Sequence, residues 1–156
     1  MDTYRIFVSS PGDAHFERLR VDRVVARLNG ELAGAVRLTT VRWETAFYSA
    51  HDTFQAQIPL STDCSIVLAI FRGRLGTELP PEFPRMPDGE PYPSGTAYEV
   101  LTAMAARREN PFPDIFVFRH AEPPSVRLDD PAAMQNGESL RCFDHSPRLQ
   151  RHPGTA

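Results

Sequence analysis

The sequence contains no lysine, so all of its basic side chains other than histidine are arginines. A Walker A phosphate loop and a Schiff-base mechanism each need a lysine, and both are therefore excluded. The sequence has 17 arginines and 20 aspartates and glutamates, which gives a net charge of −3. This mild negative charge gives no strong signal of nucleic-acid binding, because nucleic-acid-binding domains usually carry a marked excess of basic residues.

Cysteines and long apolar segments are also scarce. The two cysteines, Cys64 and Cys142, form no CxxC pair and have no metal-ligand spacing, which argues against a disulfide framework and a metal site. The longest apolar run extends only from Ile66 to Phe71, whereas a membrane-spanning helix needs roughly 20 residues. No apolar signal segment opens the sequence. We therefore expect a cytoplasmic protein that has no membrane partner and holds no metal ion.

Strand-like and helix-like segments alternate through residues 1–120. Strands are predicted where β-branched and aromatic residues gather, and helices where apolar residues recur every three or four positions. The expected strands are 4–9, 36–43, 65–71 and 114–119, and the expected helices are 15–32, 52–58 and 96–108. This alternation predicts an α/β protein with a flavodoxin-like, open, mainly parallel sheet of four to five strands. Helices are expected on both faces, because the apolar run at Ile66–Phe71 fits a strand that is covered on both sides.

Proline is over-represented, with 15 residues, and it marks two segments. A Pro-rich loop covers residues 77–94, and loops of this length in compact domains usually act as lids or binding loops. After His120 the periodicity stops, and residues 121–156 combine prolines and charges without an apolar face. The sequence therefore predicts a folded domain over residues 1–120 and a Pro-rich, mostly disordered or degenerate tail over residues 121–156.

The predicted sheet indicates where a ligand would bind, because open parallel sheets bind ligands outside the carboxyl ends of their strands. The candidate ligand-binding residues at these ends are Ser9, Ser10, Asp13, Trp43, Arg72 and Gly73. Most of them have a purely structural alternative. The two serines suit strand-end turns, Asp13 suits a helix N-cap, Trp43 suits the core and Arg72 suits a solvated surface.

Glu99 is the candidate catalytic residue. It lies one turn into the predicted helix 96–108, after the Pro-rich loop and at the ligand-binding edge of the sheet. A carboxylate there would stabilise an oxocarbenium-like sugar during N-glycosidic cleavage, or attack that sugar as a nucleophile. The alternative is a capping box of Thr96 and Glu99, in which Glu99 only bonds the backbone amide of the N-cap residue. The spacing alone leaves both alternatives open.

Four segments, taken in order, resemble the uncharacterised TIR-like family known as DUF 4062. They are Tyr4–Asp13 followed by Glu17-Arg18, Val41–Glu44, Ile70–Thr77 and Tyr92–Glu99. The resemblance covers residues 3–120 and implies a flavodoxin-like, TIR-like fold. It also implies a signalling domain that self-associates or works with a STAND-type NTPase partner. Some TIR domains cleave NAD with a helix glutamate, and others only self-associate.

The segment Ser94–Glu99 is also similar to the glutamate motif of nucleoside deoxyribosyltransferases, which break N-glycosidic bonds. This similarity implies a catalytic role for Glu99 and a ligand contact for the adjacent Tyr98. The sequence departs from the TIR-like pattern in two places. Members of the family often have an aromatic residue near Arg72, which implies a different cleft wall after the third strand here, and no closing amphipathic helix is expected after His120.

Three hypotheses about function follow. In the first, the protein cleaves NAD or a related nucleotide, which is a substrate and not a resident cofactor. In the second, it is a non-catalytic interaction module of a STAND-type signalling system. In the third, it senses a nucleotide without turning it over. Only the surroundings of Glu99 in the sequence favour the first.

Overall fold

The computed structural model describes residues 1–42, 60–121, 129, 131 and 134–135. Its strands alternate with helices along the chain, and a short 3-10 helix precedes the third strand. The elements are β1 (Asp2–Ser9), α1 (His15–Glu31), β2 (Val36–Val41), η3 (Ser61–Asp63), β3 (Ile66–Phe71), α2 (Gly95–Glu109) and β4 (Asp114–Arg119).

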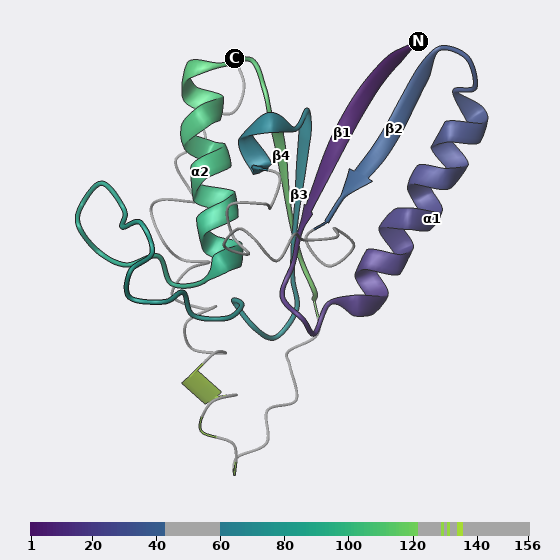
Figure 1. The fold of residues 1–156 in the computed structure, drawn as a ribbon. Helices are drawn as coiled ribbons and strands as arrows, with labels where there is room; N and C mark the ends of the chain where they lie inside the picture. Colours follow the sequence, from purple (N-terminus) through teal and green to yellow (C-terminus); the bar gives the residue numbers. More distant parts are fainter. Residues whose placement is uncertain (43–59, 122–128, 130, 132–133, 136–156) are drawn as a thin grey trace, which may run out of the picture.

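The described strands form one sheet in the order β2-β1-β3-β4, and every neighbouring pair is parallel. All four carboxyl ends therefore lie at the same edge of the sheet (Figure 1). The chain moves outward from β1 to β2 and then crosses back over β1 to reach β3. This reversal places a topological switch point between β1 and β3, where open α/β sheets form a ligand crevice.

Helices cover both faces of the sheet, with α1 on one side and α2 on the other (Figure 1). The alternation of side chains along β1 accounts for this arrangement. Ile6 and Val8 point to one face and pack in a buried cluster with Val25 of α1. Phe7 points to the opposite face and packs with Ala103 of α2. The predicted open parallel sheet with helices on both faces is therefore confirmed.

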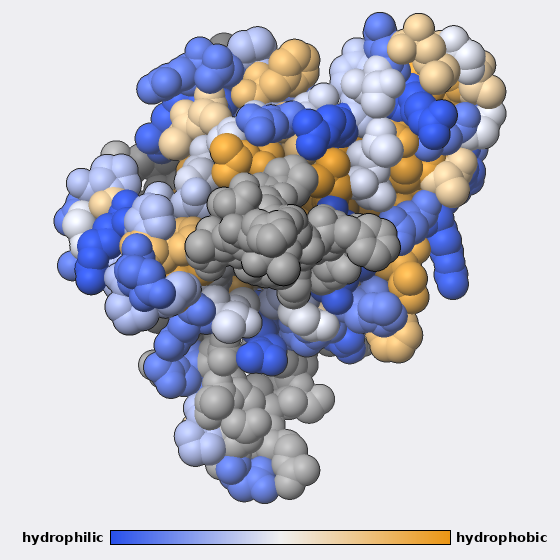
Figure 2. Space-filling view, in the orientation of Figure 1, coloured by the Kyte–Doolittle hydropathy of each residue, from blue (hydrophilic) through white to orange (hydrophobic). Residues whose placement is uncertain are grey.

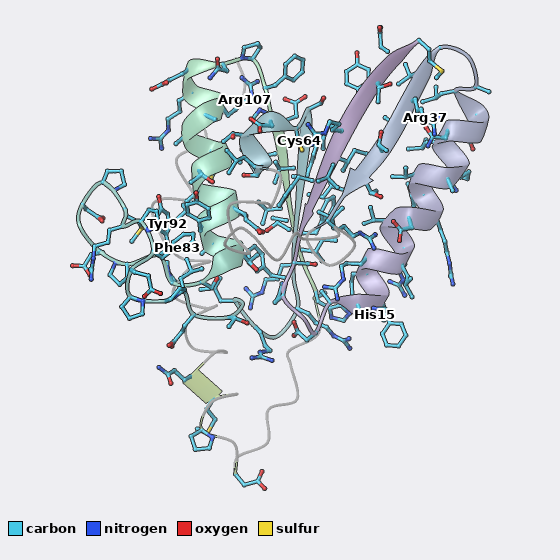
Figure 3. The ribbon with its side chains drawn as sticks, in the orientation of Figure 1. His15, Arg37, Cys64, Phe83, Tyr92 and Arg107 are labelled. Carbon is cyan, nitrogen blue, oxygen red and sulfur yellow. The ribbon has the colours of Figure 1, made fainter. Side chains whose placement is uncertain are left out.

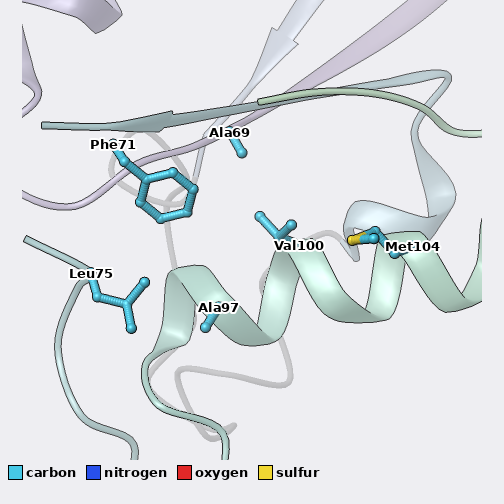
Figure 4. Packing of buried hydrophobic residues seen from close by; sticks show 6 residues of the cluster. All are labelled: Ala69, Phe71, Leu75, Ala97, Val100 and Met104. Atoms are coloured by element: carbon cyan, nitrogen blue, oxygen red, sulfur yellow. The ribbon is translucent and has the colours of Figure 1, made fainter. Parts of the chain in front are cut away.

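The packing of α2 on β3 fixes the position of the helix start. Its buried cluster joins strand residues, one loop residue and one face of the helix (Figure 4): Ala69, Phe71, Leu75, Ala97, Val100 and Met104. Val100 has no exposed surface, and burying a side chain of this size contributes about 1.5–3 kcal/mol. The first turns of α2 are thus held against the carboxyl-terminal half of β3, next to the switch point.

Several expected elements have different bounds or lie outside the described residues. The strand expected at 36–43 ends at Val41. The helix expected at 52–58, Trp43 and nearly all of the expected tail at 121–156 lie outside the described residues. Asp13 is not the N-cap of α1, because Ala14 occupies that position and no side chain caps the helix. Asp13 instead accepts a hydrogen bond from the backbone amide of Gly73, at 3.0 Å.

Hydrophobic residues reach the surface over parts of α1 (Figure 2). Phe16 is 67% exposed and Val24 is 44% exposed. Val25 is the most buried apolar residue of α1, with 9% of its surface exposed. Within the described residues, no helix combines the length and the apolar character that crossing a membrane requires.

Candidate functional site

A pocket of about 760 Å³ opens at the carboxyl edge of the sheet. Four segments that are distant in sequence form its described walls: the β1–α1 loop, η3, the loop after β3 and the first two turns of α2. The volume lies within the range of small-molecule sites, which is roughly 300–1,000 Å³. The pocket therefore lies where the topology predicts a ligand, and the Pro-rich loop supplies one of its walls.

Glu99 lines this pocket and accepts a short hydrogen bond from a neighbouring strand. The hydroxyl of Ser9, at the end of β1, donates to Oε2 of Glu99 at 2.6 Å. Ser9 itself is fully buried. A bond of this length to a carboxylate is of the strong, charge-assisted kind. Ser9 therefore lies behind Glu99 and orients its carboxylate, and the ligand contact predicted for Ser9 is replaced by a contact with Glu99.

The capping alternative for Glu99 is wrong, because the N-cap of α2 lies two residues before Thr96. Ser94 is the N-cap, and its hydroxyl accepts the backbone amide of Ala97 at 3.1 Å. Ala97 therefore occupies the position from which a capping-box glutamate would reach back. Glu99 lies two residues further along α2, and its carboxylate bonds to Ser9 instead.

The backbone around Glu99 is also fixed by side chains. The hydroxyl of Ser61 in η3 donates to the backbone oxygen of Glu99 at 2.9 Å. One turn further along α2, the hydroxyl of Thr102 donates to the backbone oxygen of Tyr98 at 2.7 Å. Ser61 is buried, with 4% of its surface exposed. Such support limits the range of positions open to the Glu99 carboxylate, which a catalytic group requires.

The turn that leads into the Pro-rich loop packs tightly against the start of α2. Gly76 has a φ of 126°, and a Cβ added there would lie 2.9 Å from the Thr96 hydroxyl. Ser94 donates its hydroxyl to the backbone oxygen of Leu75 at 2.8 Å. The amide of Gly95 bonds to the backbone oxygen of Thr77 at 3.1 Å. Only glycine fits at position 76. The hydrogen bonds of Ser94 and Gly95 connect the loop to the helix that carries Glu99.

Aromatic side chains form part of the pocket wall. Tyr98 of α2 packs edge to face with Phe83, at 4.8 Å between ring centroids, and with Tyr92, at 5.0 Å. Phe83 and Tyr92 lie together beside the first turns of α2 (Figure 3). Burial raises the pKa of Tyr92, with smaller contributions from Tyr98 and Asp88. Tyr98 and Phe83 line the pocket, and the ligand contact of Tyr98 stays a prediction.

The other predicted ligand contacts are only partly brought together. Ser10 lines the pocket. The backbone amide of Gly73 donates a hydrogen bond to the Asp13 carboxylate. This bond connects the β1–α1 loop to the loop after β3. Neither these two residues nor Arg72 are among the described lining residues. Trp43 lies outside the described residues.

Sequence reasoning missed the residue that shapes the β1–α1 wall of the pocket. Arg18 of α1 is 92% removed from solvent, being 8% exposed. Its guanidinium donates to the hydroxyl of Ser10 at 3.0 Å and to the backbone oxygen of Pro11 at 2.9 Å. Arginine suits this task because its rigid fork presents several donors at once. Arg18 precedes the buried Val25 by seven residues, which is about two helical turns, so the spacing places both on the buried face of α1. Only the charge of Arg18 argues for a solvated position.

Cys64 is a buried thiol that is not among the described residues of the pocket wall. Cys64 is 3% exposed, and desolvation by burial raises the pKa of its thiol. A buried thiol with a raised pKa is a weak nucleophile, so Cys64 has the properties of an unreactive core residue. Among the residues that the structure describes, no group of three or more histidine, cysteine, aspartate or glutamate side chains is arranged to hold a metal ion.

Comparisons with known proteins add no relative. No protein-family model, curated protein or solved structure matches the chain.

Proposed function

We propose that the protein cleaves an N-glycosidic bond with Glu99, and that its substrate is NAD or a related compound with a ribose attached to a nitrogen base. The observation that carries this proposal is the Glu99 carboxylate, oriented by a fully buried hydroxyl at 2.6 Å, on the wall of a pocket at the switch point. The TIR-like resemblance of the sequence supports the same reaction.

The reaction needs few groups from the protein. When the bond between C1′ and the base nitrogen breaks, its electron pair leaves with the base, and the sugar becomes an oxocarbenium-like cation. The Glu99 carboxylate stabilises that positive charge, and it does so more strongly in the transition state than in the ground state. Water then adds to C1′ and releases one proton. Ser9 keeps the carboxylate oriented while the charge develops.

Base release from NAD is the direct test. Purified protein is incubated with NAD, and free nicotinamide is followed by chromatography. The proposal expects nicotinamide to accumulate in proportion to protein concentration and time. A preparation that leaves NAD and other N-ribosides intact, also at high protein concentration, contradicts it.

A second candidate function is a non-catalytic module that self-associates or docks on a STAND-type partner. A specific observation favours it. β4 lies at the edge of the described sheet, and its Phe116 and Phe118 are 50% and 55% exposed. They lie opposite Leu68 and Ile70 of β3 in the register, on the sheet face that carries α1. Exposed aromatic residues on an edge strand are typical of an association surface.

A further inference from the structure

The pocket is acidic in the part of the chain that the structure describes. Three glutamates line it: Glu99 on α2, and Glu78 and Glu82 on the Pro-rich loop. No arginine or histidine is among the described lining residues. Because like charges in a partly enclosed site repel, a phosphate group placed here would face an unfavourable field.

The start of α2 has few free backbone amides that could offset this repulsion by binding a phosphate. Helix N-termini bind anions through their first free backbone amides. In this helix two of those amides already have partners within the chain. The Gly95 amide bonds to the backbone oxygen of Thr77, and the Ala97 amide bonds to the Ser94 hydroxyl. The helix start therefore stabilises its own loop and is not arranged as an open anion site.

The same pocket is well suited to a cation. Aromatic faces attract positive charge, and Phe83 and Tyr98 contribute aromatic rings to the wall that also carries Glu82 and Glu99. The edge-to-face contact of Phe83 with Tyr98 holds the two rings at nearly right angles, at 89°. Carboxylates combined with a fixed aromatic wall are a common way to bind a positively charged heteroaromatic ring.

We infer that this pocket selects a cationic, phosphate-free N-riboside, such as a ribosylated pyridinium, over the corresponding 5′-phosphate and over the dinucleotide. This inference rests on the proposed function and narrows its substrate class. Glu78 and Glu82 exclude the phosphate, and the aromatic wall and carboxylates hold the cationic base. The positive charge also makes the base a good leaving group, because the electron pair of the broken bond neutralises the ring nitrogen.

Binding is measured separately from cleavage with carbocyclic analogues, which lack the ring oxygen needed to form the oxocarbenium cation. Calorimetry on the wild-type protein compares carbocyclic nicotinamide riboside with its 5′-phosphate and with its uncharged dihydro form. The riboside is expected to bind at least about tenfold more tightly than either. In the double variant Glu78→Gln with Glu82→Gln, the preference over the 5′-phosphate is expected to fall to about threefold or less. Glu90→Gln removes an exposed carboxylate of the same loop that does not line the pocket, and it should leave the preference unchanged.

The possible outcomes separate this inference from the proposed function. Equal or tighter binding of the 5′-phosphate overturns the inference, whether or not wild-type protein cleaves NAD. A preference that survives in the double variant also overturns it. Tight binding of the riboside analogue without cleavage of nicotinamide riboside supports the ligand class and contradicts the proposed cleavage. Absence of binding by all three analogues contradicts the inference, and cleavage of NAD under those conditions would leave the proposed function standing alone.

Discussion

The hydroxyl of Ser9 donates from β1 to the Glu99 carboxylate, and its removal tests whether that hydrogen bond matters for function. In Ser9→Ala we expect turnover of an N-riboside to fall about tenfold, because the carboxylate loses a fixed orientation. The free energy of unfolding should fall by about 1–3 kcal/mol, as is usual for a hydrogen bond to a charged group. Steady-state kinetics and chemical denaturation measure both effects.

Ser61→Ala is the matched control for Ser9→Ala. It also removes a buried hydroxyl that bonds to Glu99, but its partner is the backbone oxygen and not the carboxylate. We expect a comparable loss of stability and a smaller loss of turnover. Equal losses of turnover in the two variants would show that Ser9 acts only on the stability of the site.

The residues of the candidate site were predictable to different degrees. Glu99 follows from its place near the start of a helix that comes after a long loop, and Ser10 follows from its place at a strand end. The role of Asp13 did not follow, because its bond to Gly73 joins residues 60 positions apart. A local rule for helix caps cannot detect such a partner, since it considers only neighbours along the chain.

At the scale of elements, Gly76 joins the loop after β3 to the start of α2, and substitution there tests the shape of the pocket wall. Gly76→Ala forces a side chain into a positive φ and into contact with the Thr96 hydroxyl. We expect a loss of about 2–4 kcal/mol in the free energy of unfolding. Gly30→Ala, in α1, meets no atom within 4 Å and should instead stabilise the protein by about 0.5–1 kcal/mol. Thermal or chemical denaturation compares the two variants, and similar effects would contradict this description of the turn.

The exposed aromatic residues of β4 test the association alternative. In the double variant Phe116→Thr with Phe118→Thr, any self-association seen for the wild type in sedimentation velocity should be lost. Stability should change little, because both side chains are half exposed. Phe16→Thr removes an exposed aromatic residue from α1 and serves as the control. Oligomers that persist in the β4 variant would place the contact elsewhere.

The elements themselves were largely predictable, and their ends were not. The apolar run at Ile66–Phe71 predicted β3 to within one residue, because a strand buried on both faces has a distinct composition. The start of α2 was shifted, since Thr96 and Ser94 are both good N-caps and only packing decides between them. Ser94 bonds to Leu75 across the turn, and this tertiary contact favours it.

At the scale of the whole molecule, the order of the strands determines where a ligand can bind. Alternating strands and helices predict a parallel sheet, and the flavodoxin-like expectation adds the order β2-β1-β3-β4 that places the switch point between β1 and β3. That order brings Ser9 and Glu99 together across 90 residues of sequence. The acidic character of the pocket also depends on the fold, because Glu78 and Glu82 lie on a loop whose path the sequence does not determine.

The most direct test of a catalytic Glu99 is turnover and unfolding measured together on wild type and Glu99→Gln. Glutamine keeps the size of the side chain and an oxygen that accepts the Ser9 hydroxyl, but it removes the negative charge. We expect nicotinamide release to fall by about 10²–10³-fold, while the free energy of unfolding stays within about 1 kcal/mol of wild type. Nicotinamide release by Glu99→Gln at the wild-type rate would contradict a catalytic role for this carboxylate.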